Sequence, residues 1–128
     1  MQSNYSDTQI NRVITSKLVS FDEFVDTVNA TAHDVKVVLF LSRLLDRIFE
    51  YRIKGLTLTK TQACRMIPAE HIETCKKYVD DAERLGFIRF EPDPIDKRKT
   101  IIVPTEELID YVRGKAAAIL DEMRQIIS

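Results

Sequence analysis

The spacing of the apolar residues changes only once along this chain, and that change limits the folds the chain can adopt. Over residues 87–91 and 100–103, β-prone side chains partly alternate with polar ones, whereas apolar residues elsewhere recur every three or four positions. A polar stretch over residues 92–99, rich in Pro and Asp, separates the two candidate strands. The pattern predicts a mainly α-helical fold that contains one small β-hairpin.

Pairs of residues typical of capping boxes mark where several helices begin. Ser6 with Gln9 opens a first helical segment over residues 7–28, and a further box predicts a break near Ser20. A second helix over about 34–53 is apolar on most sides. A helix of that kind is usually central to the core, because each of its faces must be covered.

Two further helices lie between residue 53 and the expected hairpin, and one helix follows the hairpin. Thr59 with Gln62 opens a short helix, and Pro68 interrupts the pattern before a helix that continues to about Leu85. Thr105 begins a long helix after the hairpin. This order predicts a winged helix-turn-helix, in which one helix enters the major groove of DNA and the preceding helix braces it.

The length and composition fit one such domain over residues 1–128. Two Cys and two His are too few for a disulfide scaffold, and their spacing indicates no zinc site. The sequence has no Gly-rich phosphate loop and no nucleophile motif, so we expect no metal, no cofactor and no enzymatic activity. It also has no evident signal peptide or membrane span, which favours a cytoplasmic protein.

Three short motifs surround the expected hairpin. Residues 83–88 read Glu-Arg-Leu-Gly-Phe-Ile, residues 93–98 read Asp-Pro-Ile-Asp-Lys-Arg, and residues 103–107 read Val-Pro-Thr-Glu-Glu. Together they resemble the C-terminal half of the MarR family of transcriptional regulators. That family starts its wing with Gly and two hydrophobic residues, has an Asp-Pro-x-Asp-x-Arg wing, and opens its next helix with Thr-Glu-Glu. The resemblance implies a homodimer that binds double-stranded DNA specifically, at a pseudo-palindromic operator.

The resemblance also implies roles for residues of the DNA-binding lobe, 34–103. Arg98 at the wing tip would enter the minor groove, while Asp93 and Asp96 would structure the wing, since Asp readily bonds its own backbone in turns. The recognition helix would lie in the major groove. The other residues expected at DNA are His71, Glu73, Thr74, Lys76, Lys77, Lys97 and Lys99. The resemblance further implies that a small-molecule effector could bind in a pocket between this lobe and the dimerisation helices.

Long apolar stripes occupy the terminal segments 7–28 and 105–127. A chain this short has little surface to cover two such stripes, so a second copy is the simpler partner, although the stripes could also complete a monomeric core. We expect the two segments to dimerise the protein through Ile10, Ile14, Val112, Ile119, Met123 and Ile127.

The charge of the expected recognition helix keeps a second function open. Over residues 69–85 acidic side chains outnumber basic ones, which weakens attraction to phosphates, although Glu can accept hydrogen bonds from cytosine. The alternative is a winged-helix protein-interaction module with little intrinsic DNA binding. Cys64 and Cys75 also leave two interpretations open, a redox switch across the helix-turn-helix or two small buried thiols.

Overall fold

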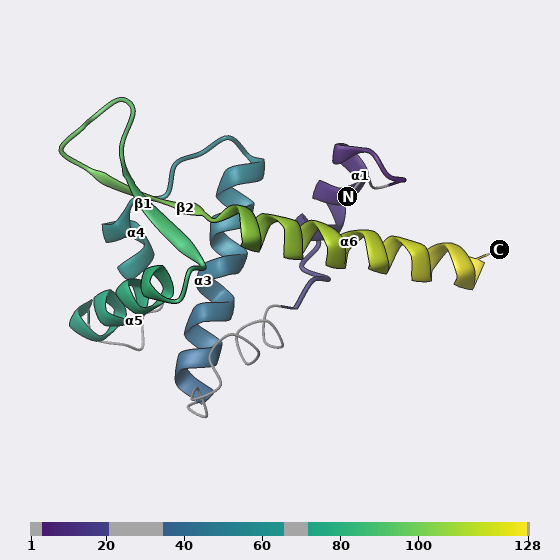
Figure 1. Cartoon of the computed structure of the whole chain (residues 1–128), viewed down its shortest axis with the longest axis horizontal. Helices are drawn as coiled ribbons and strands as arrows, with labels where there is room; N and C mark the ends of the chain where they lie inside the picture. The colour runs from purple at the N-terminus through teal and green to yellow at the C-terminus, as the bar shows by residue number, and fades with distance from the viewer. Residues whose placement is uncertain (1–3, 21–34, 66–71, 128) are drawn as a thin grey trace.

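The computed structural model describes residues 4–20, 35–65 and 72–127 of the chain (Figure 1). The elements, labelled as in Figure 1, are α1 (Asp7–Thr15), α3 (Val35–Ile53), α4 (Lys60–Cys64), α5 (Ile72–Arg84), β1 (Ile88–Pro92), β2 (Thr100–Pro104) and α6 (Glu106–Ile127). Strands β1 and β2 pair antiparallel. The expected mainly helical fold with one hairpin is therefore confirmed.

The hairpin is joined to the segment that leads into α4. Phe90 of β1 lies opposite Ile102 of β2. The backbone N–H of Ile102 donates to the Leu58 carbonyl at 2.8 Å, and Thr59 forms an isolated bridge with Ile101. These contacts fix the base of the hairpin against the start of α4, while the loop beyond β1 and β2 projects away from the helices (Figure 1).

Local signals set the helix ends as expected. Both capping boxes form, Ser6 with Gln9 at α1 and Thr59 with Gln62 at α4. Gly86, two residues beyond the end of α5, has a φ of +85°, a left-handed conformation that Gly adopts easily. These starts and stops depend on neighbouring residues alone, which is why the sequence could predict them.

Several boundaries differ from expectation, and both strands end one residue later than expected, at Pro92 and Pro104. Helix α1 ends at Thr15, and the break predicted near Ser20 falls earlier, at Ser16 and Lys17, where Lys17 takes a φ of +60°. The first strand begins at Ile88 rather than one residue earlier. The expected segment 7–28 beyond residue 20, the expected start of the second helix at residue 34 and the interruption at Pro68 lie outside the described residues.

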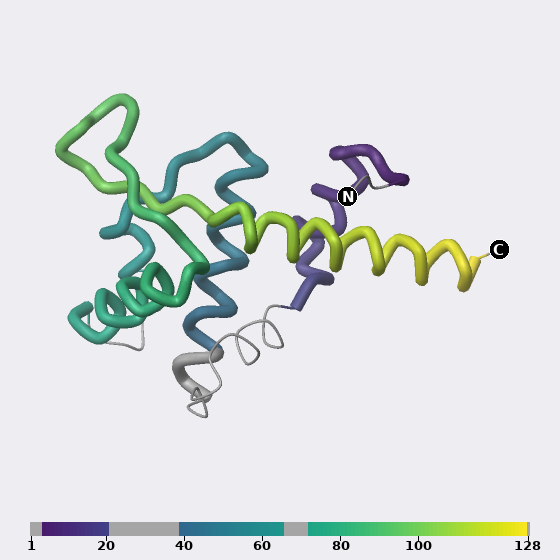
Figure 2. The backbone as a smooth tube through the Cα atoms, viewed as in Figure 1, coloured from purple at the N-terminus to yellow at the C-terminus, as the bar shows by residue number. Residues whose placement is uncertain are grey.

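Helix α3 is central to the core. It contacts α1 on one side and both α5 and β2 on the other. Leu41 and Leu45 are completely buried in it. On the far side of the molecule α1 crosses α6 (Figure 2), and Ile10 of α1 and Val112 of α6 are both completely buried. The lobe that carries the hairpin and the α1–α6 pair therefore share one core.

No helix within the described ranges is long and apolar enough to cross a membrane.

Candidate nucleic-acid interface

The wing, which is the loop over residues 93–99, is closed by hydrogen bonds at both ends. Asp93 is only 8% exposed, and its Oδ1 accepts from the backbone N–H groups of Ile95 at 2.8 Å and Asp96 at 3.3 Å. Its own N–H donates to the carbonyl of Lys99 at 2.9 Å. Asp93 therefore acts as the turn former that the sequence predicted, and its bonds limit the conformations of the wing tip.

Arg98 extends from this loop while remaining anchored to it. Its side chain is 91% exposed, yet both its backbone N–H and its Nε donate to Oδ1 of Asp96, each at 3.1 Å. The hydrogen bond from the Arg98 side chain lowers the pKa of the Asp96 carboxyl, so Asp96 stays ionised at neutral pH. Asp96 thus orients a guanidinium that solvent, or a ligand, can reach.

A basic groove of about 640 Å³ lies between the wing, α4 and α5. Cationic side chains reach it from all three elements, and none of the described residues that line it is acidic. Its lining consists of Thr59, Lys60, Thr61, Gln62, Cys64, Arg65, Lys76, Arg98, Lys99 and Thr100. Such a concentration of positive charge on a chain of net charge −1 suits a polyanion.

The predicted DNA contacts are only partly brought together here. Lys76, Arg98 and Lys99 line the basic groove. Lys97 is exposed on the wing, and Glu73 and Lys77 are exposed on α5, outside the groove lining, whereas Thr74 is half-buried. His71 lies outside the described residues.

Lys60 and Arg65, at opposite ends of α4, are groove residues that the sequence analysis did not single out. Lys60 Nζ lies 2.7 Å from Oδ1 of Asp80 and 4.6 Å from the centre of the Phe90 ring. Arg65 forms no ion pair within the part of the chain that the structure describes. The sequence could have predicted both residues, because the first helix of a helix-turn-helix crosses the DNA backbone and basic residues flank that helix here.

The acidic residues of α5 are largely compensated by neighbouring cations. Glu73 pairs with Lys76 at 3.5 Å, Asp80 with Lys60 at 2.7 Å, and Asp81 with Arg84 at 2.8 Å. Exposed pairs of this kind add little stability. Their effect here is to reduce the negative field of α5 beside the basic groove.

Cys64 and Cys75 are both buried, and neither forms a disulfide. Burial raises the pKa of the Cys64 thiol, so it stays protonated and weakly nucleophilic at neutral pH. This favours the interpretation of the two cysteines as packing residues. Among the described residues, no group of His, Cys, Asp and Glu is arranged to bind a metal ion.

The residues predicted for dimerisation divide into two sets. Ile10, Ile14 and Val112 lie in the protomer's own core between α1, α3 and α6. Ile119 is half-buried against that core. Met123 and Ile127, by contrast, are 44% and 83% exposed on the last turns of α6.

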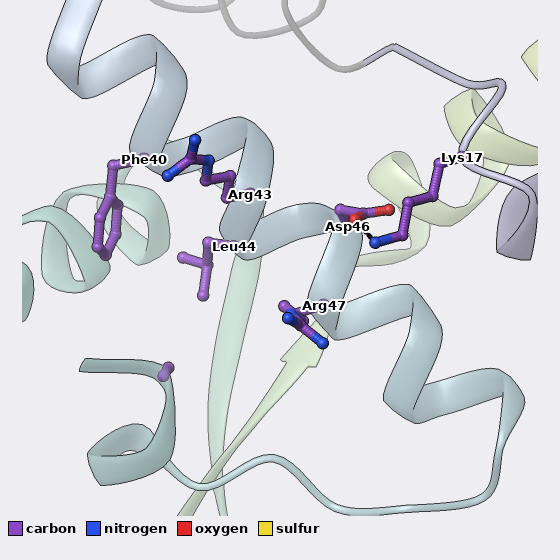
Figure 3. Close-up of a pocket in the computed structure, with 7 residues that line it drawn as sticks. Lys17, Phe40, Arg43, Leu44, Asp46 and Arg47 are labelled. Atoms are coloured by element: carbon purple, nitrogen blue, oxygen red, sulfur yellow. Dashed lines mark ion pairs between the residues drawn. The ribbon is translucent and has the colours of Figure 1, made fainter. Parts of the chain in front are cut away.

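A second, smaller pocket of about 250 Å³ lies where the segment after α1 approaches α3 and α4. Figure 3 shows Lys17 paired with Asp46 of α3. Phe40, Arg43 and Leu44, which also belong to α3, line the same pocket. The Lys17–Asp46 distance is 3.5 Å. Among the described residues, the pocket therefore combines an apolar wall with three cations, Lys17, Arg43 and Arg47, and the carboxylate of Asp46.

No family model matches the sequence, and no curated protein matches it. Among solved structures, Staphylococcus aureus MepR bound to ethidium bromide superposes with a TM-score of 0.54 at 18% identity, over 96% of this chain and 81% of that one. A MepR mutant bound to an oligodeoxyribonucleotide gives 0.51 at 18% identity, over 97% and 83%. The chain has the winged-helix fold of MepR. This confirms the fold class expected from the MarR-like motifs.

The bonds of Asp93 predict that the wing depends on its carboxylate. Asp93→Ala leaves two backbone N–H groups of the turn without their acceptor, which should lower the free energy of unfolding by about 1–3 kcal/mol. Asp93→Asn keeps an oxygen that accepts the same bonds and should cost much less. Urea unfolding measures the stability, and amide exchange at Ile95 and Asp96 reports the turn. Equal stability and exchange in wild type and Asp93→Ala would refute this role.

Proposed function

We propose that the protein is a homodimeric regulator that binds double-stranded DNA through the basic groove and the wing. The observation that carries this proposal is the convergence of five cationic side chains from α4, α5 and the wing on one groove. Phosphate neutralisation supplies most of the affinity in protein–DNA binding, and this groove offers the necessary charges. That a MepR mutant with the same fold was solved bound to an oligodeoxyribonucleotide supports the proposal.

In the proposed complex each element has a distinct task. Helix α5 enters the major groove, where Thr74, Lys76 and Lys77 reach base edges or phosphates and Glu73 accepts from a cytosine amino group. Helix α4 crosses the backbone, so its flanking cations contact phosphates. The wing places Arg98 in the minor groove, where a narrow A-tract has the strongest negative potential.

A winged-helix protein-interaction module remains the alternative. It is motivated by the acidic residues of α5, of which Glu73 is the most exposed of those in ion pairs. A protein partner would be bound through an exposed face of α5 and would not need the cations of the groove. The two functions differ in the salt dependence of DNA affinity, which is steep only when phosphates are bound.

Arg98 should contribute more to DNA affinity than any other single residue, because it is both exposed and anchored by Asp96. Arg98→Ala should weaken binding roughly tenfold to a hundredfold, equivalent to about 1–3 kcal/mol. Arg84→Ala is the matched control, since Arg84 also pairs with a nearby Asp but does not line the groove. The measurement is a fluorescence titration, at two salt concentrations, of a duplex that the protein retains from a genomic fragment library.

Two results would count against this assignment. If Arg98→Ala binds like wild type while Lys76→Ala abolishes binding, the wing is not the anchor. If the wild type retains no duplex at low salt, the protein-interaction module becomes the better proposal.

We propose that a second copy covers the end of α6. Every residue from 121 to 127 is exposed, including the apolar Met123, Ile126 and Ile127. This end of the helix extends beyond α1 and the lobe (Figure 2). A helical end with exposed apolar side chains gains from burial against an identical one, which gives a closed two-fold dimer.

Charges introduced at this end should therefore dissociate the protein. The double variant Met123→Glu, Ile127→Glu should weaken self-association by at least about tenfold, because it places carboxylates in an apolar contact. The fold should persist, since both positions are exposed within one protomer. Leu56→Glu, at another exposed apolar position, is the control. Sedimentation velocity at micromolar concentration measures the mass, and a monomeric wild type would contradict the proposal.

We further propose that the pocket beside Arg43 binds a small anionic ligand with an apolar body. Among its described lining residues cations outnumber carboxylates, and Phe40 and Leu44 supply the apolar wall. MepR has been solved bound to ethidium bromide, so a small molecule can occupy a protein of this fold. The volume of about 250 Å³ limits the ligand here to roughly one ring.

Benzoate serves as the probe for this pocket. In large excess over its Kd, benzoate should raise the free energy of unfolding by about 1–3 kcal/mol through binding to the folded state. Benzamide, which has the same shape without the charge, should do less. Arg43→Gln should remove the benzoate effect and Arg12→Gln, on α1, should retain it. Two results would be evidence against an anion site. One is an equal shift of the melting temperature by benzoate and by benzamide, and the other is an equal benzoate shift in Arg43→Gln and Arg12→Gln.

A further inference from the structure

Ile95, at the tip of the wing, is the most exposed large apolar side chain in the described part of the molecule. It is 96% exposed, and its neighbours in the loop are turn-forming or charged residues. Single exposed apolar residues are common on protein surfaces and need no explanation by themselves. Ile95 differs because of how the loop holds it and because of the charges beside it.

The wing fixes the backbone of Ile95 while leaving its side chain in solvent. Its N–H donates to Asp93 Oδ1 at 2.8 Å, and Pro94 before it restricts the chain further. The N–H of Lys99 donates to the carbonyl of Asp96 at 3.0 Å, which closes the turn on the other side. The backbone that carries Ile95 is therefore constrained, and a partner that meets the wing tip encounters its exposed apolar side chain.

Three cations follow Ile95 within four residues. Lys97, Arg98 and Lys99 are exposed, and the last two line the basic groove. Any polyanion attracted to these charges meets the isoleucine at the same time. A protein partner with an apolar patch would not require this run of cations, so the surroundings favour nucleic acid.

We infer that Ile95 is an apolar wedge that enters the minor groove beside Arg98 and packs against the sugars and the edge of one base step. The inference rests on the proposed DNA-binding function and adds a second, uncharged contact to it. Minor-groove binding proteins insert Phe, Leu, Ile, Met or Pro between base pairs and thereby bend the duplex. Pyrimidine–purine steps unstack most easily, so the wedge favours a TA or CA step under the wing.

An apolar wedge has a signature that a cation does not share. It releases no counterions, so its loss lowers affinity without changing the slope of log K against log salt. Loss of Arg98 should reduce both the affinity and the steepness of this slope. Ile95 thus contributes to affinity and bending, while the cations contribute to affinity and salt dependence.

The experiment compares Ile95→Ala, Ile95→Leu and the control Leu56→Ala on one retained duplex. Titrations over a salt series should show that Ile95→Ala binds about tenfold more weakly with an unchanged salt slope, because several buried methyl groups are lost. Ile95→Leu should keep most of the affinity, and Leu56→Ala should bind like wild type. Energy transfer between dyes at the duplex ends should show less bending with Ile95→Ala.

The outcomes separate this inference from the function on which it rests. If the wild type binds DNA with a steep salt slope but Ile95→Ala binds and bends it equally well, the wedge is wrong and DNA binding stands. If Ile95→Ala lowers the salt slope, the residue only positions the cations, and the wedge is again wrong. If the wild type does not bind DNA, both proposals fail. Equal urea midpoints for wild type and Ile95→Ala establish that an affinity loss is not unfolding.

Discussion

Burial of α3 on two sides determines how the other elements can be arranged. Leu41 and Leu45 are fully covered, and the helix contacts α1 in one direction and α5 and β2 in the other. A 19-residue helix with apolar residues on most sides must be surrounded, since leaving one such face in water would forfeit much of the hydrophobic stabilisation. The basic groove and the α1–α6 pair are consequently two surfaces attached to one core.

The parts of this molecule that the sequence predicted are those governed by neighbouring residues. The capping boxes at Ser6 and Thr59 and the turn bonds of Asp93 each involve groups two or three positions apart. The basic groove is different, because Lys60 and Lys76 belong to separate helices that only packing brings together. An apolar stripe is ambiguous for a similar reason. The sequence shows that Ile10 needs a partner surface, but the fold decides that α6 of the same chain supplies it.

A nearly neutral total charge conceals a strongly uneven distribution. Acidic residues of α5 pair with Lys60, Lys76 and Arg84, so their main local effect is to hold cations in place. Asp96 does the same for Arg98 on the wing. Carboxylates beside the basic groove therefore reduce its field somewhat but restrict the side chains that DNA would contact. Fewer side-chain rotamers are then lost on binding, which offsets part of the reduced attraction.

Thr105 connects two regions that lie on either side of the hairpin in sequence. Its Oγ1 donates to the Gly86 carbonyl at 2.8 Å and accepts from the N–H of Leu108 at 3.3 Å, so one side chain joins the turn after α5 to the first turn of α6. In a dimer joined at the C-terminal end of α6, a rotation of this helix would also move α5, because Thr105 links the first turn of α6 to the turn after α5. A change of a few degrees between the two α6 helices would alter the separation of the two α5 helices, and successive major grooves on one face of DNA are about 34 Å apart. In the DNA complex proposed above, the Thr105 hydroxyl would thereby help to determine which spacing of half-sites a dimer accepts.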